Sequence, residues 1–136
     1  MEVSAAPSGF APHFKRSPVT DPWEPIFSCR HETGVQLGLW VREAHCNSRG
    51  FLHGGVIAAL ADNAMGLSCV GALAAARSAV TVSLNVDYLA TAKPGQWLQI
   101  APRVVKCGRT LGFADALITA DGEPIARATA TFRMLE

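Results

Sequence analysis

The sequence predicts an α+β domain in which an antiparallel sheet of about six strands wraps around one long central helix. The run at 54–73 is apolar on nearly all sides, so a helix there needs cover from most directions. Two strand-like segments precede this run and four follow it, and strands gathered around one helix are typical of α+β domains. The 136 residues suffice for one domain with a substantial core.

Residues 1–20 are predicted to form a flexible N-terminal arm, because they contain several prolines and show no periodicity. They also lack the charged and apolar pattern of a targeting peptide. A single domain is predicted over 21–136. It begins with one short helical turn, since Asp21 is a good N-cap and Pro22 suits the first helical position.

A hairpin is predicted before the helix, with strands at 26–31 and 35–44. The second strand alternates between apolar and other residues. One of its faces should therefore be buried, and that face carries Val35, Leu37, Leu39 and Val41.

The segment 80–88 follows the helix and alternates strictly, which predicts a strand. One face should carry its valines and Leu84, and the other Thr81, Ser83, Asn85 and Asp87. Further strands are predicted at 97–105, 110–120 and 124–135, the last two joined by a turn at Asp121-Gly122-Glu123. Candidate inward residues of the last strand are Ile125, Ala128, Phe132 and Met134.

The composition argues against several classes of protein. Apolar residues make up 49% and charged residues only 17%, a surplus that predicts further burial between copies of the chain. A net charge of +1 without any basic run argues against a nucleic-acid partner. Four widely spaced cysteines predict reduced thiols in a cytoplasmic protein. The apolar run at 56–70 is shorter than the roughly 20 residues of a membrane span, which predicts a core helix and no membrane partner.

Two features of the helix predict a catalytic site. Asp62 stands near its middle, where a carboxylate is costly unless it is paired or used. Gly54 and Gly55 stand at its start, where open N–H groups favour anions and polarised carbonyls. Eight residues of helix separate Gly54 from Asp62 by about 12 Å. If both act on one substrate, they must therefore come from different subunits.

The polar residues before the helix leave alternatives open. His53 could be a general base, a ligand or a residue that fixes the turn, and the helix N-terminus favours the last of these roles. Asn47 could equally be a turn former. Cys46 with His53 suggests a cysteine nucleophile, and adding His45 suggests zinc, but neither the context nor the spacing supports these sites. The segment 106–110 reads as an exposed turn, with a phosphate contact as the minority interpretation.

The pattern Asn47-x-x-Gly50-x-Leu52-His53-Gly54-Gly55, followed seven residues later by Asp62, resembles the hotdog-fold acyl-CoA thioesterases. The similar branch contains the phenylacetate-pathway thioesterase and thioesterase superfamily member 2. The segments 79–95 and 104–111 extend the resemblance, which spans roughly residue 35 to the C-terminus. It implies a hotdog fold in a homodimer with shared active sites, commonly paired into a homotetramer.

The resemblance also implies roles for individual residues. Asp62 would be the nucleophile or the general base, Asn47 would position water or the thioester, and the Gly54 N–H of the other subunit would polarise the thioester carbonyl. His53 would support that loop, and Thr81 falls where the branch has an active-site serine. The implied contacts to substrate or coenzyme A are Gly55, Ser83, Tyr88, Leu89, Ala90, Thr91, Ala92, Lys93, Lys106, Cys107, Gly108, Arg109, Thr110 and Leu111.

The expected activity is hydrolysis of an aromatic or medium- to long-chain acyl-CoA, with coenzyme A as part of the substrate and neither a cofactor nor a metal. An apolar setting makes a carboxylate a stronger base or nucleophile, which suits this reaction. Two alternatives are a non-catalytic acyl-CoA sensor and a hotdog enoyl-CoA hydratase. Candidate lining residues of the acyl pocket are Trp40, Phe51, Leu60 and Met65.

Overall fold

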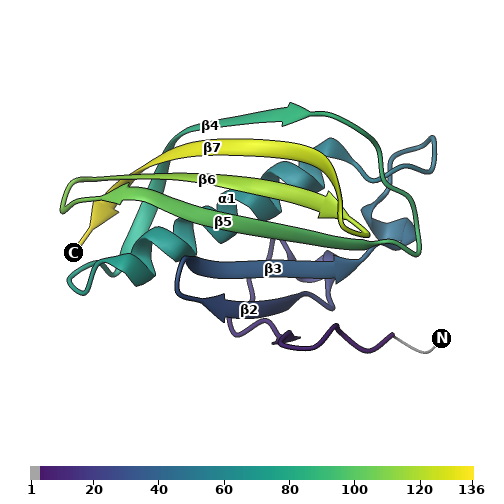
Figure 1. Ribbon diagram of the computed structural model, residues 1–136, viewed down its shortest axis with the longest axis horizontal. Helices are drawn as coiled ribbons and strands as arrows, with labels where there is room; N and C mark the ends of the chain where they lie inside the picture. Colours follow the sequence, from purple (N-terminus) through teal and green to yellow (C-terminus); the bar gives the residue numbers. More distant parts are fainter. Residues whose placement is uncertain (1–3) are drawn as a thin grey trace.

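The computed structural model describes residues 4–136 and shows one long helix, α1 (Gly54–Ala72), against one face of an antiparallel sheet (Figure 1). The sheet order is β1-β2-β3-β5-β6-β7-β4. Its strands are β1 (Ala11–Pro12), β2 (Phe27–His31), β3 (Gly34–Trp40), β4 (Ser78–Tyr88), β5 (Trp97–Cys107), β6 (Leu111–Ala120) and β7 (Glu123–Leu135). Two short 3-10 turns lie at Asp21–Trp23 and Glu43–His45. The predicted α+β class and the central helix are confirmed.

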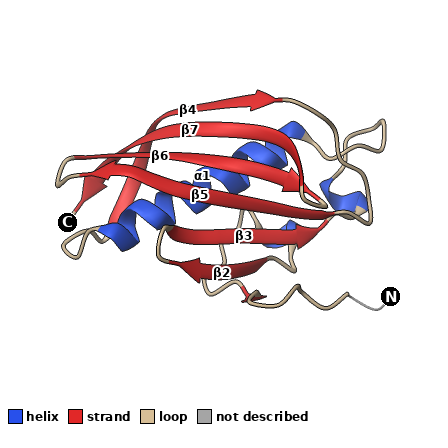
Figure 2. Cartoon of the chain, viewed as in Figure 1, coloured by secondary structure: helices blue, strands red, loops and turns tan. Residues whose placement is uncertain are grey.

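The sheet has seven strands rather than about six, because the N-terminal arm adds β1. This two-residue strand pairs with β2 at the end of the sheet opposite β4 (Figure 2). Two residues that precede β1 also contact the domain. Phe10 packs edge-on against Trp97, and the Ala5 carbonyl accepts from the Trp40 indole N–H at 3.1 Å. The flexibility of residues 1–20 stays a prediction. The described part of the arm lies beside β2, Trp40 and Trp97.

The predicted inward residues form the core between α1 and the sheet. Leu37 and Leu39 of β3 are fully buried, as are Leu60 and Met65 of α1. The hairpin turn before β7 is also as predicted, because Asp121 and Gly122 both have positive φ, which matches the twist of the paired strands. Leu60 and Met65 therefore lie in the core of the single chain, and their place in an acyl pocket stays a prediction.

The helix is less enclosed than its composition predicts. The residues that it buries follow the i, i+1, i+4 pattern of one face, while Asp62 and Asn63 on its flank are only half-buried. The sheet of one chain covers the inner face of α1 and leaves this flank open. Asp62 is therefore half-buried in the single chain, although the helix is apolar enough to predict cover from most directions.

The predicted alternation along β4 is broken by a bulge. The register against β7 shifts between Thr81 and Ser83, so Val82 has no partner in the ladder. Thr81 pairs with the buried Phe132 and faces α1, whereas Ser83 pairs with Thr131 and faces outward. The prediction that Thr81 and Ser83 share a face is wrong, because one extra residue inverts the alternation.

Candidate active site

Asp62 is held by a side chain from the neighbouring strand. The Thr81 hydroxyl donates to Asp62 Oδ1 at 2.7 Å. Because of the bulge at Val82, this hydroxyl lies on the helix-facing side of β4. A hydroxyl that donates to a carboxylate favours its ionised form and limits its rotation. Asp62 is therefore an oriented carboxylate on the open flank of α1.

Asn47 shapes the turn before the helix. Its Oδ1 accepts from the backbone N–H groups of Arg49 at 2.9 Å and Phe51 at 3.2 Å. The side-chain carbonyl is thus committed to the turn, as the turn-former alternative predicts. The Asn47 amide group is the part of this side chain that stays available as a hydrogen-bond donor to a substrate or water.

A buried histidine anchors the same turn. His45 is 1% exposed, its Nδ1 accepts from the Arg42 N–H at 2.9 Å, and its Nε2 lies 2.9 Å from the Trp23 carbonyl. Burial lowers the pKa of His45, and the nearby Arg42 guanidinium lowers it further, against the opposing effect of the Trp23 carbonyl. The ring is therefore a neutral structural group. Since both of its nitrogens are engaged, it is not a metal ligand.

Cys46 does not have the setting of a nucleophile. Its thiol donates to the Arg42 carbonyl at 3.4 Å, and burial together with Glu43 raises its pKa. A raised pKa lowers the fraction of reactive thiolate. Among residues 4–136, no group of three histidine, cysteine, aspartate or glutamate side chains is placed to hold a metal ion.

The start of α1 leaves one N–H group open. The Gly55 N–H donates to His53 Nδ1 at 2.7 Å, and the Tyr88 hydroxyl donates to the Gly54 carbonyl at 2.6 Å. The peptide group between Gly54 and Gly55 is thus held at both ends. The Gly54 N–H, in contrast, has no acceptor among residues 4–136, so it is free to donate to a carbonyl oxygen.

The two halves of the predicted site lie in different cavities of one chain. Asp62 and Thr81 line a cavity of about 200 Å³ beside the second half of α1. A second cavity, of about 300 Å³, lies at the start of the helix. Its lining includes Asn47, Gly54, Gly55, Tyr88, Ala90, Thr91 and Ala92. The structure therefore brings most of the predicted site residues into two groups and does not join them within one chain.

The sequence of residues 49–126, more than half of the chain, matches the model of the thioesterase superfamily. A Pseudomonas aeruginosa protein provisionally named an esterase is 35% identical over 130 residues, which cover 94% of this chain and 96% of that protein.

The chain belongs to the thioesterase superfamily. Human acyl-coenzyme A thioesterase 13 is 40% identical over 91 residues, which cover 64% of this chain and 63% of that enzyme. A Streptococcus mutans protein solved with acetyl CoA superimposes with a TM-score of 0.76 and 30% identity, over 90% of this chain and 94% of that one. The predicted resemblance, the hotdog fold and the enzyme class of thioester hydrolase are confirmed.

Most of the other residues predicted to contact the substrate or coenzyme A lie outside these two cavities of the thioesterase. Arg109 and Thr110 line a surface cavity near the C-terminus, where Arg109 pairs with Glu136 at 3.1 Å. The Cys107 thiol donates inward to the Cys69 carbonyl at 3.5 Å. Ser83 lies on the outer face of the sheet, away from both halves of the site. Leu89, Lys93, Lys106 and Leu111 are exposed, Gly108 forms a turn, and the Ala92 side chain is buried.

Sequence patterns missed two basic residues of this thioesterase that line the Asp62 cavity. Lys15 comes from the N-terminal arm, and Arg77 comes from the segment just before β4. The arm has no periodicity, so its sequence carries no signal for such a position. Trp40, a candidate for the acyl pocket, instead packs edge-on against Trp97 at a centroid distance of 5.1 Å.

Proposed function

We propose that this thioesterase hydrolyses acyl-CoA, releasing a free acid and coenzyme A. The observation that carries the proposal is the oriented carboxylate of Asp62, held by Thr81 on the open flank of α1. The similarity to an acyl-coenzyme A thioesterase and to a protein solved with acetyl CoA supports this substrate class. Aromatic and medium- to long-chain acyl groups remain the expected range.

The complete site is formed by two subunits in this proposal. β4 is an edge strand of the sheet described by residues 4–136, because it pairs with β7 on one side only. Its side chains are unusually apolar for such an edge, with Val80 52% and Val82 61% exposed. An edge of this length and composition is suited to pairing with a second chain. We propose that two β4 edges pair in this way and that the pairing brings Asp62 of one subunit near Gly54 of the other.

Each residue then has a defined task. The Gly54 N–H of one subunit donates to the thioester carbonyl oxygen, which gathers negative charge as the carbon is attacked. The Asn47 amide donates to the thioester or to the attacking water. Asp62 of the other subunit either removes a proton from that water or attacks the carbonyl carbon itself. The C–S bond breaks, the thiolate of coenzyme A leaves and is protonated, and one water is consumed.

The two routes differ in the origin of one oxygen atom. A water activated by Asp62 delivers its oxygen directly to the acid, whereas attack by Asp62 forms an anhydride whose hydrolysis can label the carboxylate of the enzyme. One turnover in ¹⁸O-water with excess enzyme, followed by mass spectrometry of the peptide that contains Asp62, tests for the anhydride. Label in that peptide shows the nucleophilic route, whereas label confined to the acid fits either the general-base route or hydrolysis of the anhydride at its acyl carbon.

The test of the proposed function is turnover of a panel of acyl-CoA substrates by wild type and by Asp62→Asn. Wild type should hydrolyse part of the panel, and the variant should lose at least about a hundredfold in kcat, since it lacks the reacting carboxylate. Asn63→Asp restores a carboxylate one position away and serves as a placement control in the Asp62→Asn background. Binding of acyl-CoA without turnover would instead identify a sensor protein.

We also propose that dimers pair into tetramers in the cytoplasm. The outer face of the sheet carries Phe113 at 39% and Leu117 at 46% exposure, which is apolar surface that a second dimer would cover. Light scattering coupled to gel filtration gives the mass directly. A dimer as the largest species at micromolar concentration would remove the tetramer from the proposal and leave the shared site intact.

A further inference from the structure

Two cations that line the Asp62 cavity are unpaired within the part of the chain that the structure describes. Lys15 and Arg77 line it together with Asp62, and neither forms an ion pair with any of residues 4–136. Arg103 and Arg127 are paired, with Asp115 and Asp87, whereas exposed residues such as Lys93 and Lys106 form no ion pair within residues 4–136 either. Lys15 and Arg77 are distinguished by their place, because both line the same cavity as the Asp62 carboxylate.

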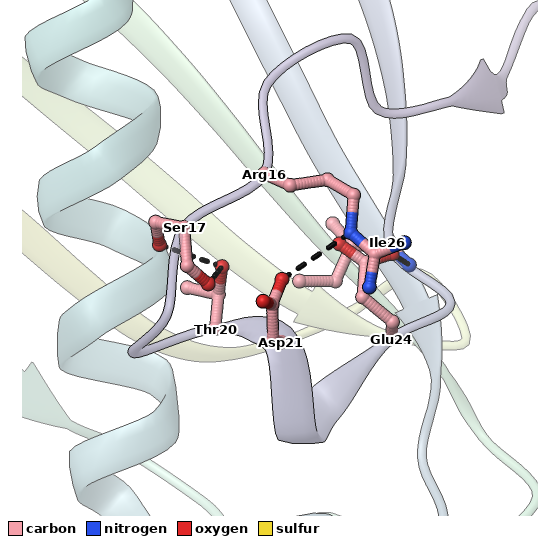
Figure 3. A network of polar contacts seen from close by, with 6 residues as sticks. All are labelled: Arg16, Ser17, Thr20, Asp21, Glu24 and Ile26. Atoms are coloured by element: carbon pink, nitrogen blue, oxygen red, sulfur yellow. Dashed lines mark hydrogen bonds and ion pairs between the residues drawn. The ribbon is translucent and has the colours of Figure 1, made fainter.

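The position of Lys15 is set by a network in the segment that follows it. Arg16 pairs with Asp21 at 3.2 Å, and the Ser17 and Thr20 hydroxyls lie 2.9 Å apart, with Thr20 only 3% exposed (Figure 3). The Asp21 N–H also donates to the Ser17 carbonyl at 2.9 Å. These local contacts fix the turn directly after Lys15, and Thr20 is its buried residue. The arm thus delivers this cation to the cavity, although its sequence shows no regular pattern.

The location of the cavity indicates which part of the substrate it receives. Its helical wall contains Gly66, Leu67 and Val70, which follow Asp62 toward the end of α1. Two other cavities are lined by predicted coenzyme A contacts, one by Tyr88, Ala90 and Thr91 and the other by Arg109 and Thr110. Within one chain this space, about 200 Å³, is smaller than those two cavities of about 300 Å³ and 430 Å³. The acyl end of the thioester is therefore its fitting occupant.

We propose that Lys15 and Arg77 bind an anionic group on the acyl chain, so that the preferred substrates are CoA thioesters of dicarboxylic or otherwise anionic acids. This inference rests on the proposed thioesterase function and deepens it by naming the substrate class. The Asp62 carboxylate repels an anionic acyl group at the same site. Two cations in the lining of the same cavity offset that repulsion and favour the charged acyl group over its neutral analogue.

The test compares matched pairs of substrates that differ by a terminal carboxylate: succinyl-CoA with butyryl-CoA, glutaryl-CoA with pentanoyl-CoA, and adipoyl-CoA with hexanoyl-CoA. The measured quantity is the ratio of kcat/KM within each pair. Wild type should favour the carboxylated member of at least one pair. Lys15→Gln and Arg77→Gln should each lower this ratio by up to about fivefold, the size of an exposed charge interaction. Arg77→Lys should retain it, and Arg77→Glu should reverse it.

Arg103→Gln is the matched control, because it removes an exposed cation that is paired on the outer face of the sheet. It should leave the ratio unchanged. A second series uses the same acyl groups on pantetheine, which lacks the phosphates of coenzyme A. If the Lys15 and Arg77 variants weaken neutral and carboxylated CoA thioesters equally, but not pantetheine thioesters, the two cations bind the phosphates of coenzyme A and the acyl assignment is overturned.

The outcomes separate this inference from the function on which it rests. If no acyl-CoA of any pair or of the wider panel is hydrolysed, the proposed function fails. If neutral acyl-CoA substrates are hydrolysed as well as or better than the carboxylated ones, the proposed function stands and the anionic-substrate inference is overturned. If the cations only balance the charge of Asp62, their variants change both members of a pair alike with either carrier, which also overturns it.

Discussion

The Thr81 hydroxyl donates to Asp62 Oδ1 at 2.7 Å, across 19 positions of sequence and between two different elements. The bulge at Val82 makes this contact possible, because without it Thr81 and Ser83 would lie on the same face. Bulges are frequent where a strand must aim a side chain at a site. Thr81 therefore positions the carboxylate and does not need to touch the reacting atoms.

Removing the Thr81 hydroxyl should impair turnover more than substrate binding. Thr81→Val keeps the shape of the side chain and loses the hydrogen bond to Asp62, so kcat should fall about tenfold with little change in KM. Thr81→Ser should restore most of the activity. Thr129→Val, on the outward face of β7, is the control and should behave as wild type. Equal kcat values for Thr81→Val and wild type would remove Thr81 from the site.

Tyr88 is predicted to act through Gly54. Tyr88→Phe keeps the ring that packs against Gly54 and removes the hydroxyl that donates to the Gly54 carbonyl at 2.6 Å. The peptide that follows the free N–H then loses the hydrogen bond from this hydroxyl, and kcat should fall about fivefold while KM changes little. A raised KM with an unchanged kcat would show instead that the Tyr88 hydroxyl contacts coenzyme A.

Acid should destabilise the fold through the buried His45 and the half-buried His13. Burial lowers the pKa values of His45 and His13 below the usual 6.5, so the unfolded chain binds protons that the folded chain excludes. The free energy of unfolding should therefore fall as the pH drops below about 6.5, until it reaches the lower pKa values of the folded state. Protonation also breaks the bond from the Arg42 N–H to His45 Nδ1.

Thermal unfolding measured between pH 8 and pH 5 checks this expectation, with the exposed His31→Gln variant as the control. Wild type and the control should lose stability alike toward acid. His45→Gln should be less stable than wild type at pH 8 and should show a weaker dependence on pH. A variant curve that runs parallel to wild type would show that His45 does not contribute to the acid sensitivity.

The exposed edge of β4 should be the dimer interface. Val82→Lys places a charge at the bulge of this edge, where the native side chain is 61% exposed, and should yield monomers without activity. Val105→Lys is a matched control on β5, where the side chain is 60% exposed. It should leave the dimer and its activity in place. An active Val82→Lys monomer would contradict the shared site.

Much of the scaffold follows from local sequence. The helix predicted at 54–73 is observed at Gly54–Ala72, and the turn residues Asp121 and Gly122 have the backbone angles that their types favour. These features depend on apolar periodicity and on the preferences of single residues. The fold could be predicted because short-range patterns determine it.

The details of the site depend on contacts that no local pattern records. A strictly alternating strand gives no sign of the bulge at Val82, and a proline-containing arm gives no sign that Lys15 lies beside Asp62. The half-buried state of Asp62 follows from how far one sheet can extend around a helix, which is a property of the assembled chain. Asn47, Gly54 and Asp62 could be named in advance because the family pattern includes them.

The most direct measurement is complementation between two inactive variants. Asp62→Asn subunits are mixed, unfolded and refolded with Asn47→Ala subunits, and native mass spectrometry confirms the mixed dimers. In a site shared between subunits, each mixed dimer contains one site with both wild-type residues, so an equal mixture should regain about a quarter of wild-type activity. Activity no higher than that of the two parent variants, with mixed dimers present, would contradict the two-subunit site.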